Sequence, residues 1–366
     1  MSEKIEKFIP TGIGGEKLKE GAEILPAIGV DNEVVWVNKK VKIPFDFKVG
    51  KRSNLGIFLT PDSKTNENKF HLEVSKLHGR SGILGRVVFE DKEGRLYRDI
   101  DIKGSGYGQD LGIGMEVVEP SIYYGDESYP GGKTLGVLDK SYAETDIDMT
   151  EKFLRANIRT YRSVALIKLK EIVDREGKRI TIEEAKKLGI IKETDEPVIE
   201  IRAFGTRSRV VEIERGYYEG KFDSNDPNKQ KILNDAMALI AQEQNIDPEK
   251  LTKKDYFDWF VKTIVINVAR MHNRKWIHGY LTGHNITLDA RIVDLDSIET
   301  LKEINERKKS GEIVEKSFSH DLETLIFTLE NFGYILFELN TQDNMQTVVN
   351  EIYQNEMARL KLDKQK

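Results

Sequence analysis

The hydrophobic pattern of this chain changes type along its length, and that change limits the folds it can adopt. Up to about residue 115 the sequence is rich in glycine, β-branched residues and short alternating runs such as 33–38 and 95–102, which predict strands. Strand character returns at 197–204. Beyond that point the pattern is mostly helical, with helices expected at about 228–244, 253–273, 319–338 and 343–361. This order predicts an α+β fold with two lobes.

The boundary between the two lobes is expected in the polar, turn-rich segment 217–229. Residues 1–216 would then form a strand-rich N-terminal lobe, and residues 217–366 would form a helical C-terminal lobe. The chain has 366 residues, well above the roughly 150 of a typical domain, which agrees with two lobes. Residues 116–147 mix Gly, Pro, Tyr and Asp without periodicity, so they predict a long loop or insertion.

Two local patterns predict helices within the first lobe. Apolar residues recur at helical spacing from about Thr150 to Leu169, so this stretch is expected to be helical. Thr181 and Glu184 fit a capping box, which predicts the start of a short helix, and Gly189 is suited to end it.

Composition excludes several classes of protein. The chain contains no cysteine, so disulfides, thiolate nucleophiles and Cys-ligated zinc are ruled out. Its 57 Lys and Arg against 62 Asp and Glu give a net charge of −5, whereas a general nucleic-acid binder is usually basic, so no nucleic-acid partner is expected. No stretch approaches the roughly 20 apolar residues of a membrane helix, and the first residues lack the apolar core of a signal peptide. We therefore expect a cytoplasmic protein with no membrane partner.

Closely spaced glycines precede a lysine in the strand-rich part. Gly79, Gly82 and Gly85 lie in the sequence GRSGILGRV, and Lys103 follows Gly85 by 18 residues. A glycine turn lets backbone N–H groups approach phosphate oxygens, and protein kinases place a strand lysine at about this distance from a glycine-rich loop. Gly82, Gly85 and Lys103 are therefore candidates for nucleotide binding. The alternative is that the glycines belong to an ordinary hairpin.

The most specific motif is HGYLTGHN, which begins at His278 and is followed by IVDLD. It resembles the kinase catalytic loop H-x-D-L-x-x-x-N and the metal-binding aspartate that follows it. Asn285 and Asp294 are nine residues apart, a separation that a tight hairpin accommodates, so their side chains could together bind Mg²⁺. Tyr280 stands where kinases have the catalytic aspartate. The alternatives are a strand-end role for Asp294 and a core role for His278.

A further acidic residue, Asp321, lies in the sequence SHDLETL. This segment resembles the start of kinase helix F, where an aspartate holds the backbone of the catalytic loop. The alternative is an acidic residue at the positive end of an ordinary helix. The helix expected before the loop is apolar over most of its surface, which predicts that it is buried.

Two arginines seven residues apart, Arg202 and Arg209, complete a set of motifs. Together with KGSG at Lys103, LRANIR at 154–159 and HGYLTGHN, they make the chain similar to the selenoprotein O family. That family carries KGxG, an LRSSIRE helix, an RVAxSxxR strand and HGVxNTDN, with an aspartate nine residues after the last asparagine. Its members have a kinase-like fold, bind ATP in a flipped pose and transfer AMP to protein hydroxyls.

The resemblance implies a bilobal protein-kinase-like fold and the ATP- and Mg²⁺-dependent transfer of AMP to Ser, Thr or Tyr of a protein substrate. The positions that match the family's functional residues are Lys103, Arg202 and Arg209 for the phosphates, and Asn285 and Asp294 for Mg²⁺. His284 stands where the family has the aspartate proposed as base. An imidazole titrates near neutrality and could serve as a base, or His284 could be a solvent-facing loop residue.

Departures from the family pattern leave other functions open. The helix glutamate that should pair with the strand lysine appears as Thr160, the segment after KGxG differs, and the redox Cys or selenocysteine is absent. A kinase-like phosphotransferase and a catalytically inactive pseudokinase that binds nucleotide or a partner are therefore alternatives. On a regular strand, Arg202 and Arg209 would also face opposite sides, so a bend or bulge near Gly205 is required if both reach one pocket. Otherwise both would be strand arginines paired with Glu200 or Glu212.

Overall fold

The protein is described by a computed structural model that covers residues 9–10, 22–41, 45–59, 70–75, 81–106, 136–173, 177–214, 226–337 and 342–363. The chain divides into two compact units, and the division falls within helix α1 (Lys140–Arg155). Unit 1 comprises residues 1–145 and 162–204, and unit 2 comprises residues 146–161 and 205–366. The structure therefore has a strand-rich part and a helical part, as the sequence predicts.

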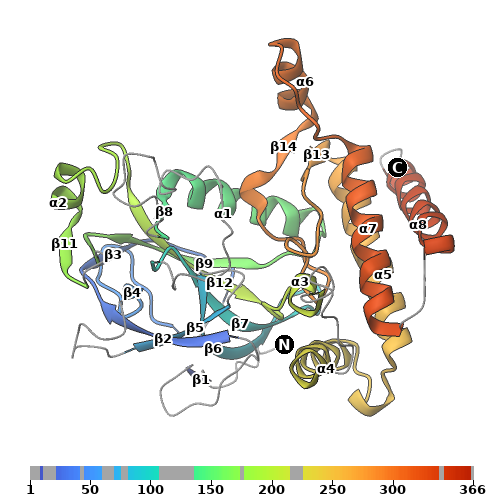
Figure 1. The fold of residues 1–366 in the computed structure, drawn as a ribbon, viewed down its shortest axis with the longest axis horizontal. Coiled ribbons are helices and arrows are strands. Elements are labelled where there is room, and N and C mark those ends of the chain that lie inside the picture. Colours follow the sequence, from blue (N-terminus) through green and yellow to red (C-terminus); the bar gives the residue numbers. More distant parts are fainter. Residues whose placement is uncertain are drawn as a thin grey trace. The chain divides into compact units, whose positions relative to one another are not determined.

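Unit 1 is built on a ten-stranded sheet in which every described pairing is antiparallel (Figure 1). The strands follow the order β3-β9-β12-β7-β6-β5-β2-β4, with β1 added to β6 and β8 added to β12. Their bounds are β1 Ile9–Pro10, β2 Ala22–Gly29, β3 Asn32–Val37, β4 Ile57–Leu59, β5 Phe70–Ser75, β6 Ser81–Glu90, β7 Leu96–Lys103, β8 Leu138–Asp139, β9 Arg162–Leu169 and β12 Pro197–Phe204.

Alternation along the central strands gives the sheet an apolar face and a charged face. Strand β7 reads LYRDIDIK, so Ile100 and Ile102 fall on one face, while Asp99, Asp101 and Lys103 fall on the other. The isoleucines belong to the hydrophobic core of unit 1. The charged residues are also buried, and buried charges require opposite charges or hydrogen bonds to remain ionised. The charged face is therefore a structural feature of the sheet and not a solvated surface.

A small hairpin of β10 (Glu171–Val173) and β11 (Arg179–Thr181) leads into the short helix α2 (Ile182–Lys187). The predicted capping box is confirmed: the Thr181 hydroxyl accepts from the Glu184 N–H at 3.1 Å, and the Glu184 carboxylate accepts from the Thr181 N–H at 2.8 Å. Gly189, with a φ of +69°, lies just after the helix.

The prediction of a helix through 150–169 is wrong in its second half. Helix α1 ends at Arg155, Asn157 adopts a left-handed conformation with a φ of 56°, and β9 begins at Arg162. Nearly all of β9 is buried, so the strand lacks the polar–apolar alternation that would have distinguished it from a helix. The loop predicted for 116–147 is likewise wrong from Leu138 onward, where β8 and then α1 begin, and its residues up to 135 lie outside the described part.

Unit 2 is mainly helical, and its four long helices confirm the helices expected from the sequence. Helices α5, α7 and α8 pack against one another (Figure 1). Rings of α5 and α7 meet in this core, as between Phe260 and Phe332, whose centroids lie 4.8 Å apart. The elements are α3 Val210–Glu214, α4 Pro227–Glu243, α5 Lys253–Asn273, β13 Trp276–Ile277, β14 Glu299–Thr300, α6 Leu301–Lys309, α7 Phe318–Phe337 and α8 Gln342–Asp363.

The observed division differs in detail from the expected lobes of 1–216 and 217–366. Unit 2 begins at Gly205, directly after β12, and it also takes in the second half of α1. Residues 215–225, which make up most of the predicted hinge, lie outside the described part. Among the residues that the structure describes, no helix has the length and apolar character needed to cross a membrane.

Candidate functional site

Asp321, in the first turn of α7, anchors the backbone of the HGYLTGHN loop. One carboxylate oxygen of Asp321 accepts from the His278 N–H at 3.0 Å, and the other accepts from the Gly279 N–H at 2.6 Å. The backbone contact expected for this aspartate is therefore confirmed. Burial would raise the pKa of Asp321, but the hydrogen bond and charge of His272 and the loop contacts hold that pKa below its usual value. Asp321 is thus the ionised anchor of the loop.

Asp321 is itself fixed by a pair of residues that the sequence analysis missed. His272, on α5, lies 3.1 Å from Asp321 through Nε2 and 3.0 Å from the Tyr353 hydroxyl through Nδ1. The His272 ring also packs on Phe318, with centroids 4.5 Å apart. Because Tyr353 lies on α8, three helices converge on the support of this loop. A buried histidine in the last turn of a helix whose other buried residues are mostly apolar is the one local signal.

His278 has a structural position. Its side chain is fully buried, and Nε2 lies 2.9 Å from the carbonyl of Val293. Burial lowers the pKa of His278, outweighing the neighbouring acidic groups, so the ring is neutral at physiological pH. A neutral Nε2–H then donates to Val293, next to Asp294. His278 therefore matches the alternative considered for it, a satisfied core histidine that ties the loop to the end of the hairpin at Val293.

Asn285 and Asp294 lie at the two ends of a tight hairpin, as their spacing predicts. The Val293 N–H donates to the Asn285 carbonyl at 3.0 Å, and Ile286 pairs with Ile292. The Asn285 amide nitrogen donates to the Tyr280 carbonyl at 2.9 Å, which orients the carboxamide and assigns its oxygen as the atom that could bind a cation.

Asp294 has an unusual backbone. Its φ of 66° and ψ of 48° lie in the left-handed region, which costs a residue other than glycine about 1–2 kcal/mol. The Ser297 hydroxyl and N–H both donate to the Asp294 carbonyl, at 2.9 and 3.2 Å, and so hold this conformation. The side chain of Asp294 is half-buried. Strained residues of this kind occur most often at functional sites.

The donor set fits Mg²⁺ held partly by a ligand. Among the described residues there is no group of three or more His, Asp or Glu side chains that could hold a metal alone. Mg²⁺ usually takes one or two carboxylate or amide oxygens and completes its shell with water and phosphate oxygens. The carboxamide of Asn285 and the carboxylate of Asp294 are oxygen donors of the required kind. Their role as metal ligands stays a prediction.

Arg209, which directly precedes α3, lies beside His284 of the HGYLTGHN loop. A guanidinium N–H of Arg209 donates to the His284 carbonyl, and the backbone of Arg209 pairs with Thr287. The His284 side chain is exposed. Four of the residues singled out from the sequence, Arg209, His284, Asn285 and Asp294, are thus brought together in unit 2. This exposure agrees with the solvent-facing position expected for His284, and its role as a base stays a prediction.

The nucleotide-binding candidates of unit 1 lie on neighbouring strands. Lys103 ends β7, with 6% of its surface exposed, opposite Ser81 on one side and Glu200 on the other. The expectation of a phosphate-binding turn at Gly82 and Gly85 is wrong, because both lie inside strand β6. A Cβ on Gly82 would stand 3.1 Å from Cβ of Leu72, so close packing against β5 explains this glycine. Gly79 lies outside the described residues.

Arg202 is part of a buried ion pair. On β12 it lies directly opposite Asp101 of β7, and its guanidinium donates to one Asp101 oxygen at 2.8 and 2.6 Å. The acidic partner that the structure describes for Arg202 is therefore Asp101, which the expected pairing with Glu200 or Glu212 did not include. Strand β12 ends at Phe204, so Arg209 is not on the same strand, and the break near Gly205 that the sequence required is present. Arg202 and Lys103 therefore lie in unit 1, whereas Arg209 and Asn285 lie in unit 2.

Thr160 does not occupy a helix position, which corrects its comparison with the helix glutamate of the family. It lies beyond the end of α1 and donates its hydroxyl to the Ile292 carbonyl at 2.7 Å. Its own carbonyl accepts from Arg291 at 2.7 Å. The buried acidic residue of α1 is Asp146, which accepts a hydrogen bond from the Tyr161 hydroxyl. A missing glutamate at Thr160 is therefore no argument against activity.

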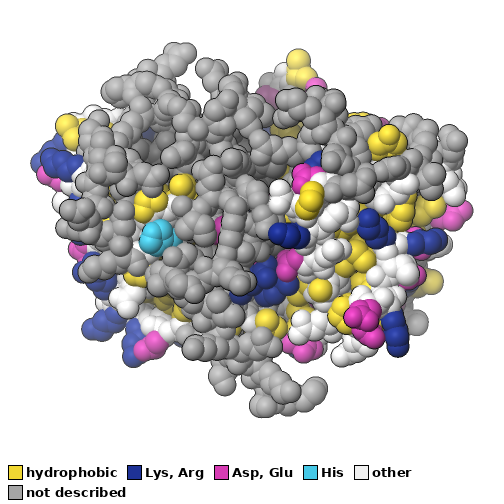
Figure 2. Space-filling view, turned by 60° about the horizontal axis from the view of Figure 1, so that its bottom comes forward, with side chains coloured by type: hydrophobic (Ala, Val, Ile, Leu, Met, Phe, Trp, Pro, Cys, Tyr) yellow, Lys and Arg dark blue, Asp and Glu magenta, His cyan; other side chains and the backbone are white. Residues whose placement is uncertain are grey.

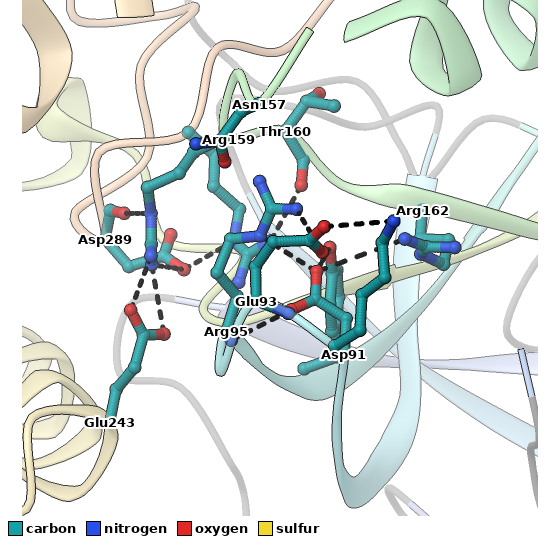
Figure 3. Close-up of polar contacts among 12 residues, drawn as sticks. Asp91, Glu93, Arg95, Asn157, Arg159, Thr160, Arg162, Glu243 and Asp289 are labelled. Carbon is teal, nitrogen blue, oxygen red and sulfur yellow. Dashed lines mark hydrogen bonds and ion pairs between the residues drawn. The ribbon is translucent and has the colours of Figure 1, made fainter. Parts of the chain in front are cut away.

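An ionic network behind the hairpin was also missed from the sequence. Figure 3 shows the Arg159 guanidinium bound to the carboxylate of Glu243 and to Asp289, whose carbonyl accepts from Nε at 3.1 Å. Asp289 is bound in turn by the fully buried Arg291 at 2.6 Å. The network fixes the hairpin between Asn285 and Asp294 to α4. Its members are up to 130 residues apart in sequence, so local patterns could not reveal it.

Figure 2 shows acidic and basic side chains interspersed over the coloured part of one face.

Comparisons with known proteins add little to this description. No protein-family model and no curated protein matches the chain. Among solved structures, the chain is similar to a Toxoplasma gondii specific rhoptry antigen kinase domain, with 9% sequence identity and a TM-score of 0.31. That likeness covers 80% of this chain and 77% of the other chain.

Proposed function

We propose that this protein has a kinase-like fold, binds ATP with Mg²⁺ and transfers AMP to a hydroxyl group of a protein substrate. The observation that carries the proposal is the loop between α5 and α7. Its backbone is anchored by Asp321, and its hairpin presents an amide and a carboxylate, Asn285 and Asp294, at one end. This is the pairing that kinase-like enzymes use to hold Mg²⁺ against phosphates.

The order of elements supports a kinase-like fold. Strands β5, β6 and β7 form a meander, and the third strand ends in Lys103. Helix α1 follows, then β9 and β12, and only then the helical unit with its loop. A lysine on the third strand, a helix after it and a later asparagine–aspartate pair form the succession found in protein kinases.

The loop sequence favours AMP transfer over phosphate transfer. Kinases take the proton of the attacking hydroxyl with an aspartate, but position 280 holds a tyrosine with 55% of its surface exposed. A phenol hydroxyl does not provide the carboxylate that takes this proton in kinases. The exposed imidazole of His284, next to Asn285, is the remaining base on this loop. The resemblance to the selenoprotein O family points the same way.

In the proposed reaction, the hydroxyl oxygen of the protein substrate attacks the α-phosphorus of ATP. The bond from that phosphorus to the bridging oxygen of the β-phosphate breaks, pyrophosphate leaves with the electron pair, and the hydroxyl proton passes to Nε2 or Nδ1 of His284. Bound Mg²⁺ neutralises phosphate charge as it develops. Asn285 and Asp294 hold the ion, while Lys103, Arg202 and Arg209 are assigned to the phosphates.

A second candidate is a nucleotide-binding scaffold without catalysis. The observation that favours it is the buried ion pair of Arg202 with Asp101, because an arginine already neutralised by a carboxylate is a weaker partner for phosphate. On this alternative, Mg²⁺ and ATP would stabilise the fold without any transfer.

Incubation with ATP labelled at either the α- or the γ-phosphate tests the proposal. We expect the α-label, and not the γ-label, to become covalently attached to protein in the presence of Mg²⁺, and the Asp294→Ala variant to lose this transfer. Attachment of the γ-label would instead identify a kinase. If neither label is transferred although ATP raises the melting temperature, the scaffold alternative holds.

A further inference from the structure

Glu214 lies behind the HGYLTGHN loop, at the end of α3, with 3% of its surface exposed. The start of α3 is hydrogen-bonded to this loop: the Val210 N–H donates to the Ile286 carbonyl and the Val211 N–H donates to the Gly283 carbonyl, each at 3.0 Å. Helix α3 is therefore fastened along the stretch that carries Asn285.

The carboxyl group of Glu214 rests directly on Gly283. A Cβ placed on Gly283 would stand 3.0 Å from the carboxyl carbon of Glu214 and 3.1 Å from the Val211 nitrogen, with a carboxyl oxygen nearer still. Backbone and carboxyl are thus in close contact, and only glycine leaves room for it. A carboxyl that moves toward the loop would therefore press on the backbone at Gly283.

This carboxyl is enclosed without a compensating partner. Among the described residues it forms no hydrogen bond or ion pair, and its Oε1 atom is fully buried. An unpartnered buried polar group costs about 1–3 kcal/mol, so its presence calls for an explanation. Burial raises the pKa of Glu214 to about 7, which means that the fold accommodates the neutral acid and resists the carboxylate.

Neighbouring charges do not offset the effect of burial on the pKa of Glu214. Helix α3 packs against α4, α7 and the loop, yet burial is the single cause of the raised pKa. The charged and titratable groups that are at least half-buried in these elements are Arg209 before α3, His278 in the loop, Glu212 on α3, Lys229, Asp235 and Glu243 on α4, and His320, Asp321 and Glu330 on α7; His284 of the loop is exposed.

We propose that Glu214 is a positioning residue: its enclosed carboxyl, packed on Gly283, holds the turn that presents the carboxamide of Asn285. Asn285 lies two residues after Gly283, and its N–H closes the same turn on the Thr282 carbonyl at 2.9 Å. A displaced Gly283 would therefore displace Asn285. The role of the presented carboxamide rests on the proposed function, but the hold on the loop can be measured on the protein alone.

Hydrogen exchange of the full chain without ligand tests this hold at three amides that donate within the contact, those of Val210, Val211 and Asn285. In the wild type we expect opening, corrected for the intrinsic exchange rate, to be about tenfold greater at pH 8 than at pH 6. A carboxyl whose pKa drops from about 7 to 4.5 on opening favours the open loop by about that factor over this interval. In Glu214→Gln, which is neutral throughout, the two pH values should give equal opening.

A matched control is Glu212→Gln on the same helix, which should keep the tenfold wild-type response. Equal opening of the wild type at both pH values would overturn the proposal, as would a tenfold response that survives in Glu214→Gln. If that variant does not fold, Glu214→Met replaces it with the same expectation.

The affinity for Mg²⁺–ATP separates this inference from the proposed function. It should weaken between pH 6 and pH 8 in the wild type and stay level in Glu214→Gln. If the wild type binds no Mg²⁺–ATP at either pH, the proposed function fails, while the exchange result still decides whether Glu214 holds the loop.

Discussion

The charged face of the sheet in unit 1 and the loop of unit 2 accommodate buried acidic groups in opposite ways. In unit 1, Asp101 faces Arg202 because the two are register partners on adjacent strands. In unit 2, Glu214 is enclosed without a partner among the described residues, and Asp294 adopts a left-handed backbone. The comparison teaches that the matched pair of unit 1 belongs to the architecture of the sheet, whereas the loop of unit 2 combines matched anchors, Asp321 and Asp289, with one unmatched and one strained acidic residue, Glu214 and Asp294.

The largest effect is expected from breaking the matched pair. Asp101→Ala leaves the Arg202 guanidinium buried without its carboxylate, and we expect a loss of about 3–5 kcal/mol in the free energy of unfolding. Chemical denaturation followed by circular dichroism measures it. Adding Arg202→Met should recover most of the loss, since the unpaired charge is then gone. A loss below about 1 kcal/mol for Asp101→Ala would show that the pair is not the main partner of Arg202.

Replacing the unmatched carboxyl of Glu214 should change the free energy of unfolding in the opposite direction and stabilise the protein. The pKa of Glu214 is raised in the folded state, so the penalty for burying its ionised form is absent below about pH 4.5, grows as the pH rises, and is complete above about pH 7. Relative to the wild type, Glu214→Gln should therefore gain about 3 kcal/mol in stability between pH 4 and pH 8. Denaturation curves across this range measure the gain, and a constant difference between the two proteins would contradict it.

A smaller effect is expected at Arg209, which contacts the loop from the segment before α3. A guanidinium can donate to the His284 carbonyl and still offer further N–H groups to a phosphate, which a lysine cannot do in the same geometry. We expect Arg209→Lys to reduce transfer of α-labelled AMP at least about tenfold, or about 1.4 kcal/mol. Arg207→Lys is the control and should matter less, because the family pattern does not require an arginine there. Wild-type transfer by both variants would remove Arg209 from the proposed site.

The smallest effect concerns the strained backbone. Glycine adopts a φ of 66° without the penalty that other residues incur, so Asp294→Gly should be more stable than Asp294→Ala by about 1 kcal/mol. Thermal melts of the two variants without ligand test this difference. Equal melting temperatures would mean that the left-handed conformation of Asp294 stores no strain. The contrast drawn between Asp294 and the paired acidic residues of unit 1 would then be wrong.

Sequence patterns predicted the parts of the fold that depend on local spacing. The capping box of Thr181 and Glu184 and the four long helices follow from neighbours on one turn or one face, and the Asp321 anchor follows from its motif. Strand β9 was missed because a strand buried on both faces has no alternation to distinguish it from a buried helix. That error carried Thr160 into a helix position it does not hold.

The remaining misses depend on residues distant in sequence. A glycine required for packing, such as Gly82 against Leu72, looks in sequence like a glycine required for a turn. His272 meets Tyr353 across 81 residues, and nothing local marks either as a partner. Glu214 sits in the short apolar run VVEIE, where a charged residue is most simply expected to face solvent. Only the fold reveals that it is enclosed.

The most direct test of the account is the affinity of the full chain for ATP, measured by calorimetry with and without Mg²⁺ in the wild type and in Asp294→Ala. We expect Mg²⁺ to strengthen binding to the wild type, and Asp294→Ala to lose at least about tenfold of the affinity measured with Mg²⁺ while its unfolding temperature without ligand stays close to that of the wild type. Unchanged affinity in Asp294→Ala would contradict the assignment of this hairpin as a magnesium–nucleotide site.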